Sequence, residues 1–407
     1  MSDRSGVLPA VLLCCWLLLL PGESLGLGKL PKAYRPRPHL PLEGGLSRNA
    51  RLCGASRLLD GLVSGPESLA ERHGLLYTGL NGGHVVRIDP RSAQVTSVAK
   101  FGASCEGPWD EEVCGRPAGV KFASDGALIV ADMYYGLFRV DVDTGQTQQL
   151  VSVNQTIAGR RPGLPNGVET APDGTIYWSD SSTTSNFRNS IVEFLDDASG
   201  RVLRLDPLTG TNTVLADELR FPNGLLLTPD QRYLYIAETG RNRILRYHLS
   251  DGSVSVLVEG LPGAPDGLRP GPGGAGILAA LISTDTPQRA TLPELLAPVP
   301  KARAALLLLL RTNRALLATA NNALPLQATR RITHVLGHTE TVFRETMARS
   351  MVVWLDDEGG ILTSMQCPAG TTRYISEAIA VGNNIYLASP FNNYIGRLPT
   401  ESLLSQL

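Results

Sequence analysis

Residues 222–249, PNGLLLTPDQRYLYIAETGRNRILRYHL, contain the pattern that decides the fold. The stretch holds a Pro-Asn-Gly triplet, an apolar segment that ends at Glu238, and a second segment that ends with Leu245, Arg246 and Tyr247. Short apolar segments separated by turn residues are typical of consecutive β-strands. The stretch therefore predicts strands joined by tight turns.

The same pair of segments recurs along the chain. Readable copies lie at residues 75–89, 127–141, 175–206, 233–247 and 384–398. Their anchors Tyr77, Ile129, Tyr177 and Tyr235 are 52, 48 and 58 residues apart, a spacing that suits a four-stranded blade and not a helical repeat. A degenerate copy fits in the 151-residue gap before the last copy. Six copies predict an all-β fold, a six-bladed β-propeller.

A helical insertion splits the degenerate copy, which is blade five. Its two strands, at 276–280 and 351–356, are separated by an insertion of about residues 284–350. Three parts of the insertion are helical in character: 292–296, 304–310 and 330–349. The apolar run at 304–310 is too short to span a bilayer. We expect it to pack on the rim of the propeller, and the alternative is a helix that lies on a membrane surface.

The amino terminus predicts entry into the secretory pathway. Residues 7–20 form an uncharged apolar run, short for a membrane span and of the right length for a signal-peptide core. Residues 1–26 are therefore a cleaved signal peptide or an uncleaved signal anchor. The protein is then secreted or membrane-anchored, with the propeller in the lumen or outside the cell. Residues 27–55 are interpreted as a linker that leads into the ring, and 56–407 as the propeller.

Composition excludes one class of partner and supports a folded chain. The 407 residues carry 37 Lys+Arg against 38 Asp+Glu, a net charge of -1, so nucleic acid is not expected as a partner. The 42 Gly and 28 Pro indicate many turns within a folded protein.

Cysteines and one asparagine add predictions that depend on an oxidising compartment. Cys105 and Cys114 bracket a short acidic loop and are predicted to form a local disulfide. Cys53 and Cys367 are left without an assigned partner. Asn154 begins an Asn-Gln-Thr glycosylation acceptor.

Polar residues recur at one phase of the repeat. Counted back from the strand anchors, the residues nine to twelve positions earlier are Glu67, Asn166, Asn223, Asp266 and Glu377. In a propeller this phase is the start of the inner strand, at one end of the central channel. The five side chains are therefore expected to converge on the axis.

Three of these residues lie in similar triplets, Pro-Asn-Gly at 165–167 and 222–224 and Pro-Asp-Gly at 265–267. Turn chemistry explains any one triplet alone. Recurrence at one phase favours a hard cation such as Ca²⁺, which binds carboxylate and amide oxygens.

Several short stretches carry a family resemblance: 65–70 (GPESLA), 114–119 (CGRPAG), 131–136 (ADMYYG), 221–224 (FPNG) and 374–377 (YISE). In combination the chain resembles the strictosidine synthase-like family from about Leu62 to Leu398, weakly through the insertion. The resemblance implies a six-bladed propeller related to paraoxonases, gluconolactonases and the regucalcin group.

The resemblance also implies a cofactor and an activity. In those relatives a Glu, Asn and Asp set binds calcium, which polarises the carbonyl of an ester or lactone. By motif, Glu67, Asn166, Asn223 and Asp266 match the metal ligands. The expected function is a calcium-dependent arylesterase- or lactonase-like hydrolase with a small-molecule substrate. Where paraoxonases place histidines, this chain has residues 133–135 (MYY), so the general base is not evident.

Two rival interpretations stay open. One is a non-catalytic propeller at the cell surface in which calcium is structural, favoured by the missing base. The other is the amine-aldehyde condensation of the plant enzymes, which use a glutamate in the last blade as acid/base. Glu377 is the catalytic candidate, with Ala380 as the alternative register, and Glu377 could instead close a hydrogen-bond network between blades.

His334 and His338 are four residues apart, with Glu340 nearby. Zinc binding is conceivable there. Without the metalloprotease pattern, the segment is interpreted as an ordinary amphipathic helix.

Overall fold

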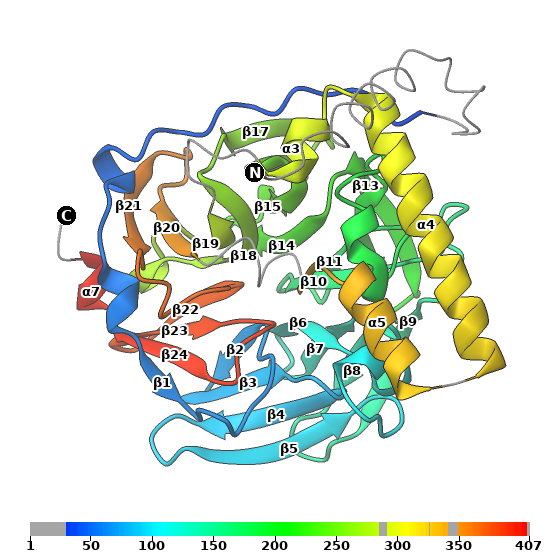
Figure 1. Cartoon of the computed structure of the whole chain (residues 1–407). Coiled ribbons are helices and arrows are strands. Elements are labelled where there is room, and N and C mark those ends of the chain that lie inside the picture. The colour runs from blue at the N-terminus through cyan, green and yellow to red at the C-terminus, as the bar shows by residue number, and fades with distance from the viewer. Residues whose placement is uncertain (1–29, 285–290, 325, 341–348, 405–407) are drawn as a thin grey trace, which may run out of the picture.

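Six four-stranded antiparallel sheets surround a central axis, the arrangement of a six-bladed β-propeller (Figure 1). The computed structural model describes residues 30–284, 291–324, 326–340 and 349–404. From the axis outward, the first three blades are β2 (Leu69–Arg72), β3 (Leu75–Gly79), β4 (His84–Asp89) and β5 (Gln94–Lys100); β6 (Pro117–Phe122), β7 (Leu128–Asp132), β8 (Gly136–Val140) and β9 (Thr147–Ser152); and β10 (Pro165–Thr170), β11 (Ile176–Asp180), β12 (Gly200–Asp206) and β13 (Thr211–Leu219).

The other three blades contain β14 (Pro222–Leu227), β15 (Tyr233–Glu238), β16 (Arg243–His248) and β17 (Val254–Glu259); β18 (Gly263–Pro270), β19 (Ile277–Thr284), β20 (Met351–Leu355) and β21 (Ile361–Gln366); and β22 (Glu377–Val381), β23 (Asn384–Ala388), β24 (Ile395–Pro399) and β1 (Ser56–Leu58). The described residues also form short helices before, between and after the strands: η2 (Gly44–Leu46), η3 (Arg51–Gly54), η4 (Pro108–Asp110), α2 (Glu111–Cys114), η5 (Phe187–Val192), η6 (Thr239–Arg241), η7 (Pro272–Gly274) and α7 (Glu401–Leu404).

The ring closes where the two ends of the propeller meet. Strand β1 pairs antiparallel with β24, with Ser56 opposite Arg397, and so supplies the outer strand of blade six. Just before β1, Cys53 forms a disulfide with Cys367, which follows the outer strand of blade five. Spacing alone does not predict this disulfide. Cys105 and Cys114, the pair that spacing does predict, form the second one.

The hydrophobic core lies between neighbouring blades. Tyr77 and Val85 of blade one, for example, share a buried cluster with Val120 and Leu128 of blade two. Every residue of β7, β11 and β20 is buried. Because both faces of a blade pack against other blades, these strands are nearly continuous apolar runs, unlike strands with one solvated face.

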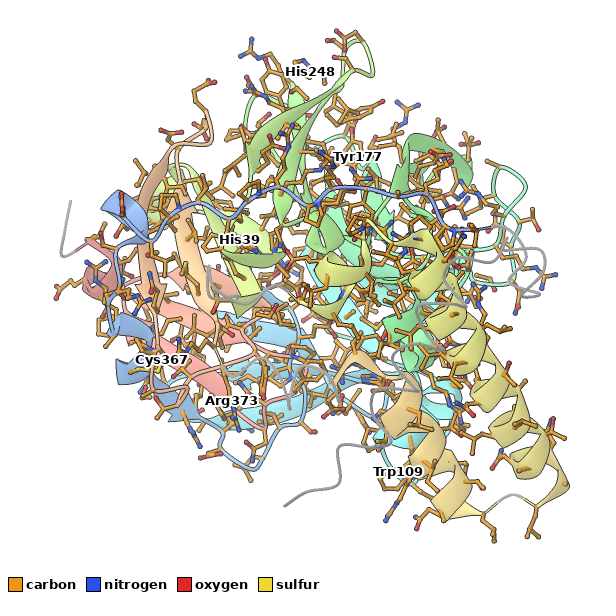
Figure 2. The ribbon with its side chains drawn as sticks, turned by 45° about the horizontal axis from the view of Figure 1, so that its top comes forward. His39, Trp109, Tyr177, His248, Cys367 and Arg373 are labelled. Atoms are coloured by element: carbon orange, nitrogen blue, oxygen red, sulfur yellow. A yellow bond between two sulfur atoms is a disulfide. The ribbon has the colours of Figure 1, made fainter. Side chains whose placement is uncertain are left out.

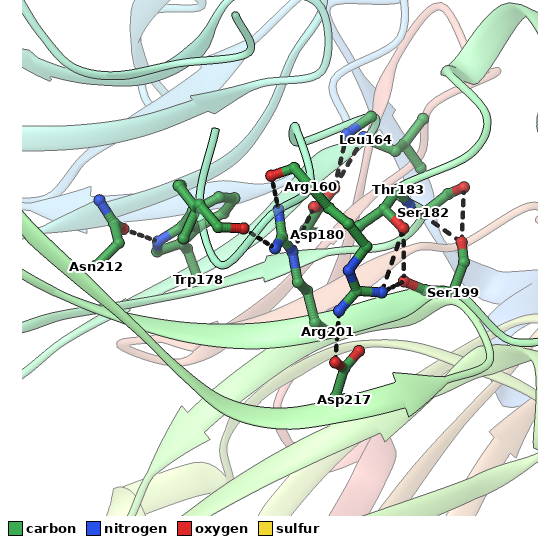
Figure 3. Close-up of polar contacts among 12 residues, drawn as sticks. Arg160, Leu164, Trp178, Asp180, Ser182, Thr183, Ser199, Arg201, Asn212 and Asp217 are labelled. Atoms are coloured by element: carbon green, nitrogen blue, oxygen red, sulfur yellow. Dashed lines mark hydrogen bonds and ion pairs between the residues drawn. The ribbon is translucent and has the colours of Figure 1, made fainter. Parts of the chain in front are cut away.

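The acidic residue that recurs at the end of the second strand of a blade holds a loop in place. In blade three, Asp180 Oδ1 accepts hydrogen bonds from the backbone N–H groups of Gly163 and Leu164, at 3.1 and 3.0 Å. Its Oδ2 lies 3.0 Å from Nε of Arg201, and both side chains are fully buried (Figure 3). Burial raises the pKa of Asp180 to about 6, although these donors oppose the rise.

Three helices lie between β19 and β20: α3 (Leu292–Leu296), α4 (Pro300–Ala323) and α5 (Gln327–Gly337). Helix α4 is much longer than the predicted 304–310 run, while α5 ends at Gly337 and residues 341–348 lie outside the described residues. Leu307 of α4 packs on Val192 and Leu195, beside blade three (Figure 1). Within the described ranges, no helix has the length and apolar character needed to cross a membrane.

The predicted linker is extended but packed. Leu40 N–H donates to the carbonyl of Gly260 at 2.6 Å, and Nδ1 of His39 lies 2.8 Å from the carbonyl oxygen of Leu261 (Figure 2). The ring of Tyr34 contacts the guanidinium groups of three arginines, Arg220, Arg241 and Arg303. The predicted signal segment, residues 1–26, lies outside the described residues.

Candidate functional site

The three triplets begin inner strands and do not form turns. Strands β10 and β14 start with Pro-Asn-Gly, and β18 contains Pro-Asp-Gly. In each, the register with the second strand of the blade shifts immediately after the proline, as in a β-bulge. The turn interpretation of these triplets is therefore wrong. A bulge re-aims a side chain at the end of a strand, and here it does so at the channel mouth.

The glycine of each triplet allows neighbouring inner strands to approach closely. A Cβ on Gly167 would lie 2.3 Å from the carbonyl oxygen of Asn223, and one on Gly224 would lie 2.4 Å from that of Asp266. The same contact continues to the next blade, where a Cβ on Gly267 would lie 2.7 Å from the carbonyl oxygen of Ser376. No side chain larger than hydrogen therefore fits at these three glycine positions.

The four predicted ligands lie together at the axis. Glu67, Asn166, Asn223 and Asp266 are 7, 3, 5 and 6% exposed and line one cavity of about 30 Å³. They come from four different blades and stretch across 200 positions of the sequence, yet their shared phase in the repeat brings them to one point. The set offers two carboxylates and two amide carbonyls, the oxygen donors that Ca²⁺ prefers.

Of the three carboxyl groups that line this cavity, Asp266 is the one for which no cationic partner is found among the described residues. Burial, together with the nearby carboxylates of Glu67 and Glu377, raises the pKa of Asp266 well above its usual value, and only a hydrogen bond with Asn223 opposes this. Burial also raises the pKa of Glu67, while Arg116 opposes the rise. Buried acids that repel each other are stabilised by a cation, so the residues present fit a divalent ion.

Arg116 is the charged partner that sequence reasoning missed. Its Nε and Nη2 lie 3.3 and 3.2 Å from Oε2 of Glu67, and Nη2 donates to the carbonyl of Pro390 at 2.9 Å. On its other side, Nη1 lies 3.8 Å from Oε1 of Glu111. The CGRPAG stretch contains this arginine, but nothing in the repeat assigns it a role, because the other blades have no equivalent cation there.

Glu377 lines the same cavity and links three blades. Its carboxylate accepts the N–H of Leu69 at 2.6 Å and lies 2.9 Å from Nη2 of Arg269. The hydroxyl of Ser68 donates to it at 3.2 Å. These contacts connect blade six to blades one and five. They form a hydrogen-bond network between blades, the alternative to a catalytic role that the sequence left open for Glu377.

An aromatic cavity lies on the other side of the predicted ligands. It also measures about 30 Å³, and the four ligand residues form part of its wall. The rest of the wall is mostly apolar and includes Met133, Phe187, Phe194, Phe221 and Phe391. Glu377 and Arg269 do not line it, so the ligand set separates a charged side of the channel from an apolar side. Sequence reasoning missed these aromatic residues because most of them lie in loops outside the repeat.

A larger cavity of about 910 Å³ shares Phe187, Pro390 and Phe391 with the aromatic cavity. Glu111, Arg116, His338 and Glu340 also line it. Burial lowers the pKa of His338, and Glu111 opposes the shift. The segment between β19 and β20 therefore contributes polar groups to the entrance of the candidate site.

Asn154, the predicted glycosylation acceptor, is exposed in a turn that follows β9. The position is accessible to modification and lies on the outer side of a blade, since β9 is the outermost strand of its sheet.

Comparison with known proteins identifies relatives by sequence. Residues 166–252 match strictosidine synthase, and residues 44–88 match the N-terminal part of strictosidine synthase-like proteins. Hemomucin of Drosophila melanogaster, an adipocyte plasma membrane-associated protein, is 34% identical over 94% of this chain and 67% of that protein. The adipocyte plasma membrane-associated proteins of Gallus gallus and Homo sapiens are 33% and 31% identical, over 88% and 92% of this chain and 80% and 84% of theirs.

Solved structures share the fold at lower identity. A gluconolactonase of Xanthomonas campestris superimposes with a TM-score of 0.53 at 17% identity, covering 91% of this chain and 96% of that one. A calcium-binding regucalcin of Agrobacterium tumefaciens gives a TM-score of 0.52 at 14% identity, covering 84% and 93%. At these identities the likeness concerns the fold alone.

Proposed function

The chain belongs to the strictosidine synthase-like family, with the adipocyte plasma membrane-associated proteins among its relatives, and from this premise we propose that it is a calcium-dependent hydrolase of esters or lactones. One observation carries the proposal: four buried oxygen-donor side chains from four blades meet between a charged channel and an aromatic cavity. Structural neighbours named for lactone hydrolysis and calcium binding support it.

Glu67, Asn166, Asn223 and Asp266 would hold the ion. When bound, Ca²⁺ supplies a Lewis acid that polarises a substrate carbonyl. The phenylalanines of the aromatic cavity would receive the apolar part of the substrate and exclude water from the reacting bond. Arg269, Ser68 and the N–H of Leu69 hold Glu377 in place, so this residue would position the ligand set from the channel side.

The proton acceptor of the reaction would come from the ligand set itself. Among the described residues that line the aromatic cavity, Glu67 and Asp266 are the ionisable ones, and both are assigned to the ion. One of these carboxylates would then have to accept the proton of the attacking water. The amine-aldehyde condensation is not proposed, because Glu377 makes its contacts on the opposite side of the ligand set.

A second candidate function is a non-catalytic cell-surface propeller with structural calcium. The volume of the aromatic cavity, about 30 Å³, favours it, since an aromatic ester does not fit unless Phe187 or Phe391 moves. In that case the ion locks four blades together, and the surface around the larger cavity binds the partner.

Hydrolysis of a phenyl ester and of an aromatic lactone, measured with calcium and with a chelator, tests the proposal. We expect turnover that requires calcium and is lost in Asn223→Ala. The matched control is Asn383→Ala, an exposed turn residue at the other end of β22 from Glu377, which should keep full activity. Absence of turnover in a protein whose melting temperature still rises with calcium would reject the hydrolase and leave the structural role.

We also propose that the protein acts in the secretory pathway or at the cell surface. The two disulfides support this, because such bonds persist in oxidising compartments, as do the names of the relatives. Asn154→Gln should remove a glycosidase-sensitive mass from the protein made in animal cells. An unchanged mass would contradict glycosylation at this site.

A further inference from the structure

Two histidines and a glutamate of the helical segment form a compact cluster away from the channel axis. His334 Nε2 lies 3.4 Å from Oε2 of Glu340, and His338 Nδ1 lies 3.9 Å from the same oxygen. One ligand atom from each of the three residues lies within 4.8 Å of the other two. The two imidazole rings are stacked, with centroids 4.3 Å apart.

The fold builds this cluster by ending a helix. Helix α5 stops at Gly337, and a Cβ on that residue would lie 2.4 Å from the carbonyl oxygen of Arg188, so α5 meets η5 closely at this point. His338, the first residue after the helix, is only 2% exposed and packs edge-on against Phe187. The change of direction after Gly337 brings Glu340 back toward His334, which a continuous helix would not do.

The loop that faces the cluster is fastened to the same helix. Arg330 pairs with Asp110 at 3.0 Å, and the guanidinium of Arg331 lies 4.1 Å from the ring centre of Trp109, which lies beside α5 in Figure 2. The next residue of this loop, Glu111, places Oε2 3.8 Å from Nε2 of His338. That nitrogen has no hydrogen-bond partner among the described residues.

From this geometry we infer a second metal site, in which Nε2 of His334, Nδ1 of His338 and Oε2 of Glu340 bind a divalent transition-metal ion such as Zn²⁺. Two imidazoles and one carboxylate are a common zinc ligand set, and its bonds of about 2.0–2.1 Å place tetrahedral ligand atoms about 3.3 Å apart. The separations of 3.4 and 3.9 Å to Glu340 need only a small contraction, and the two histidine nitrogens, within 4.8 Å of each other, must approach further. Metal binding at His338 would replace the hydrogen bond that Nδ1 now accepts from Glu340 N–H at 3.1 Å.

Glu111 serves as the outer partner of this site. A metal-binding imidazole commonly donates its other N–H to a carboxylate, which fixes the tautomer and the ring orientation. With Nδ1 on the metal, the proton of His338 is on Nε2 and faces Glu111. This role explains why Nε2 of the buried His338 faces the carboxylate of Glu111 at 3.8 Å, a distance too long for a hydrogen bond.

The site shares no ligand with the proposed calcium site and has softer ligands. Its nitrogen donors suit zinc, whereas the all-oxygen set at the axis suits calcium. His338 and Glu340 line the 910 Å³ cavity, so the site borders a space that admits water. The ion would join the helices to the remainder of the ring at the entrance of the candidate site.

Equilibrium dialysis of the chelator-treated, tag-free protein against Zn²⁺ tests the inference. We expect about one bound zinc per chain, a zinc-dependent rise in melting temperature, and a tetrahedral visible spectrum after loading with Co²⁺. His334→Gln and His338→Gln should each weaken binding by more than about tenfold and abolish the Co²⁺ spectrum. Glu340→Gln should do the same, and it offers a milder change if a histidine variant does not fold.

Two controls separate this site from other binding. His248→Gln, at a strand edge of blade four where the ring packs on Tyr233, should bind zinc as the unaltered protein does. Asn223→Ala should also keep the zinc, whatever its effect on calcium or hydrolysis. The inference is overturned if the unaltered protein takes up no zinc, or if the three ligand variants bind it with unchanged affinity.

Discussion

The glycine of each inner-strand triplet occupies a position where the neighbouring blade leaves no room for a side chain. Gly167, Gly224 and Gly267 each contact a backbone carbonyl of the next inner strand. In the first two cases that carbonyl belongs to the residue that supplies the next predicted ligand. A glycine therefore sets the spacing between neighbouring ligands. The sequence pattern Pro-Asn-Gly indicates close packing of neighbouring inner strands at the axis.

Gly224→Ala should destabilise the ring and weaken calcium binding together. The added Cβ would lie 2.4 Å from the carbonyl oxygen of Asp266, which is backbone and cannot swing away. We expect a loss of about 1–3 kcal/mol or more in the free energy of unfolding, measured with urea. Gly54→Ala, where the nearest atom is a side-chain carbon 3.9 Å away, is the control and should change little. Equal stability of the two variants would contradict the packing argument.

Asp132 makes a separate prediction about pH. Its Oδ1 accepts N–H groups of Tyr134 and Tyr135 at 2.9 and 3.0 Å, while Oδ2 is buried and has no hydrogen-bond partner among the described residues. Burial raises the pKa of Asp132 to about 7. The folded protein therefore holds this proton more tightly than the unfolded chain, so the stability contribution of Asp132 is full below its ordinary pKa and is lost as pH rises to about 7.

Asp132→Asn mimics the protonated acid and should remove this dependence. We expect the variant to match the unaltered protein near pH 5 and to be the more stable of the two at pH 8. Denaturant unfolding of both proteins at both pH values gives the difference between their free energies of unfolding. The contributions of other titrating groups cancel in this difference. A difference that does not change with pH would show that Asp132 titrates normally.

At the scale of the element, a residue's position relative to the strand repeat decides whether the sequence can predict its place in the site. Each predicted ligand lies at or near the start of an inner strand, ten to twelve positions before an apolar anchor, so a repeat found in the sequence places all of them at one end of the channel. The loops between strands have no such period. Phe187 and Phe391, which line the aromatic cavity, come from loops in two blades, and nothing local relates them.

The second strand of a blade also carries a recurring acid, whose role is clear only from its partners. Asp180 and Arg201 form a fully buried pair that joins β11 to β12, and Arg201 also donates to the carbonyls of Ile157 and Arg160 (Figure 3). Asp180→Asn would leave the guanidinium buried without a counter-charge. We expect a loss of about 3–5 kcal/mol, the usual cost of breaking one side of a buried pair.

The surface pair Arg139 and Asp125 provides the control for this prediction. It joins the turn before β7 to β8 in exposed form, where solvent screens the charges. Asp125→Asn should therefore reduce the free energy of unfolding far less than Asp180→Asn. Comparable losses in urea unfolding would mean that burial does not set the strength of the pair.

At the scale of the whole molecule, the contacts that complete the structure join residues far apart in the chain. Glu111 faces His338 across the entrance, and Arg116 joins Glu67 to Pro390. Pattern within one blade cannot predict such contacts, because they depend on loops from different blades meeting over the channel. The same limit applies to cysteines, whose connectivity is not deducible from spacing when they are distant.

Closure of the ring gives the last prediction. Cys53 and Cys367 are 314 positions apart, and their bond fastens the segment that carries β1 to blade five, while β1 itself completes blade six. Cys105 and Cys114 are only 9 positions apart. A crosslink restricts the unfolded chain more when its loop is longer, so the chain-entropy estimate is roughly 5–6 kcal/mol for the first disulfide and roughly 2–3 kcal/mol for the second.

Replacing each pair with alanines, one pair at a time, compares the two bonds. We expect Cys53→Ala/Cys367→Ala to lower the free energy of unfolding more than Cys105→Ala/Cys114→Ala. It should also make the chain near β1 sensitive to limited proteolysis, because only the three-residue strand β1 and hydrogen bonds such as those of Asn49 and Arg51 to β21 then hold this segment. If the short-loop variant proves the less stable, β1 pairing suffices to close the propeller, and the long disulfide contributes little beyond it.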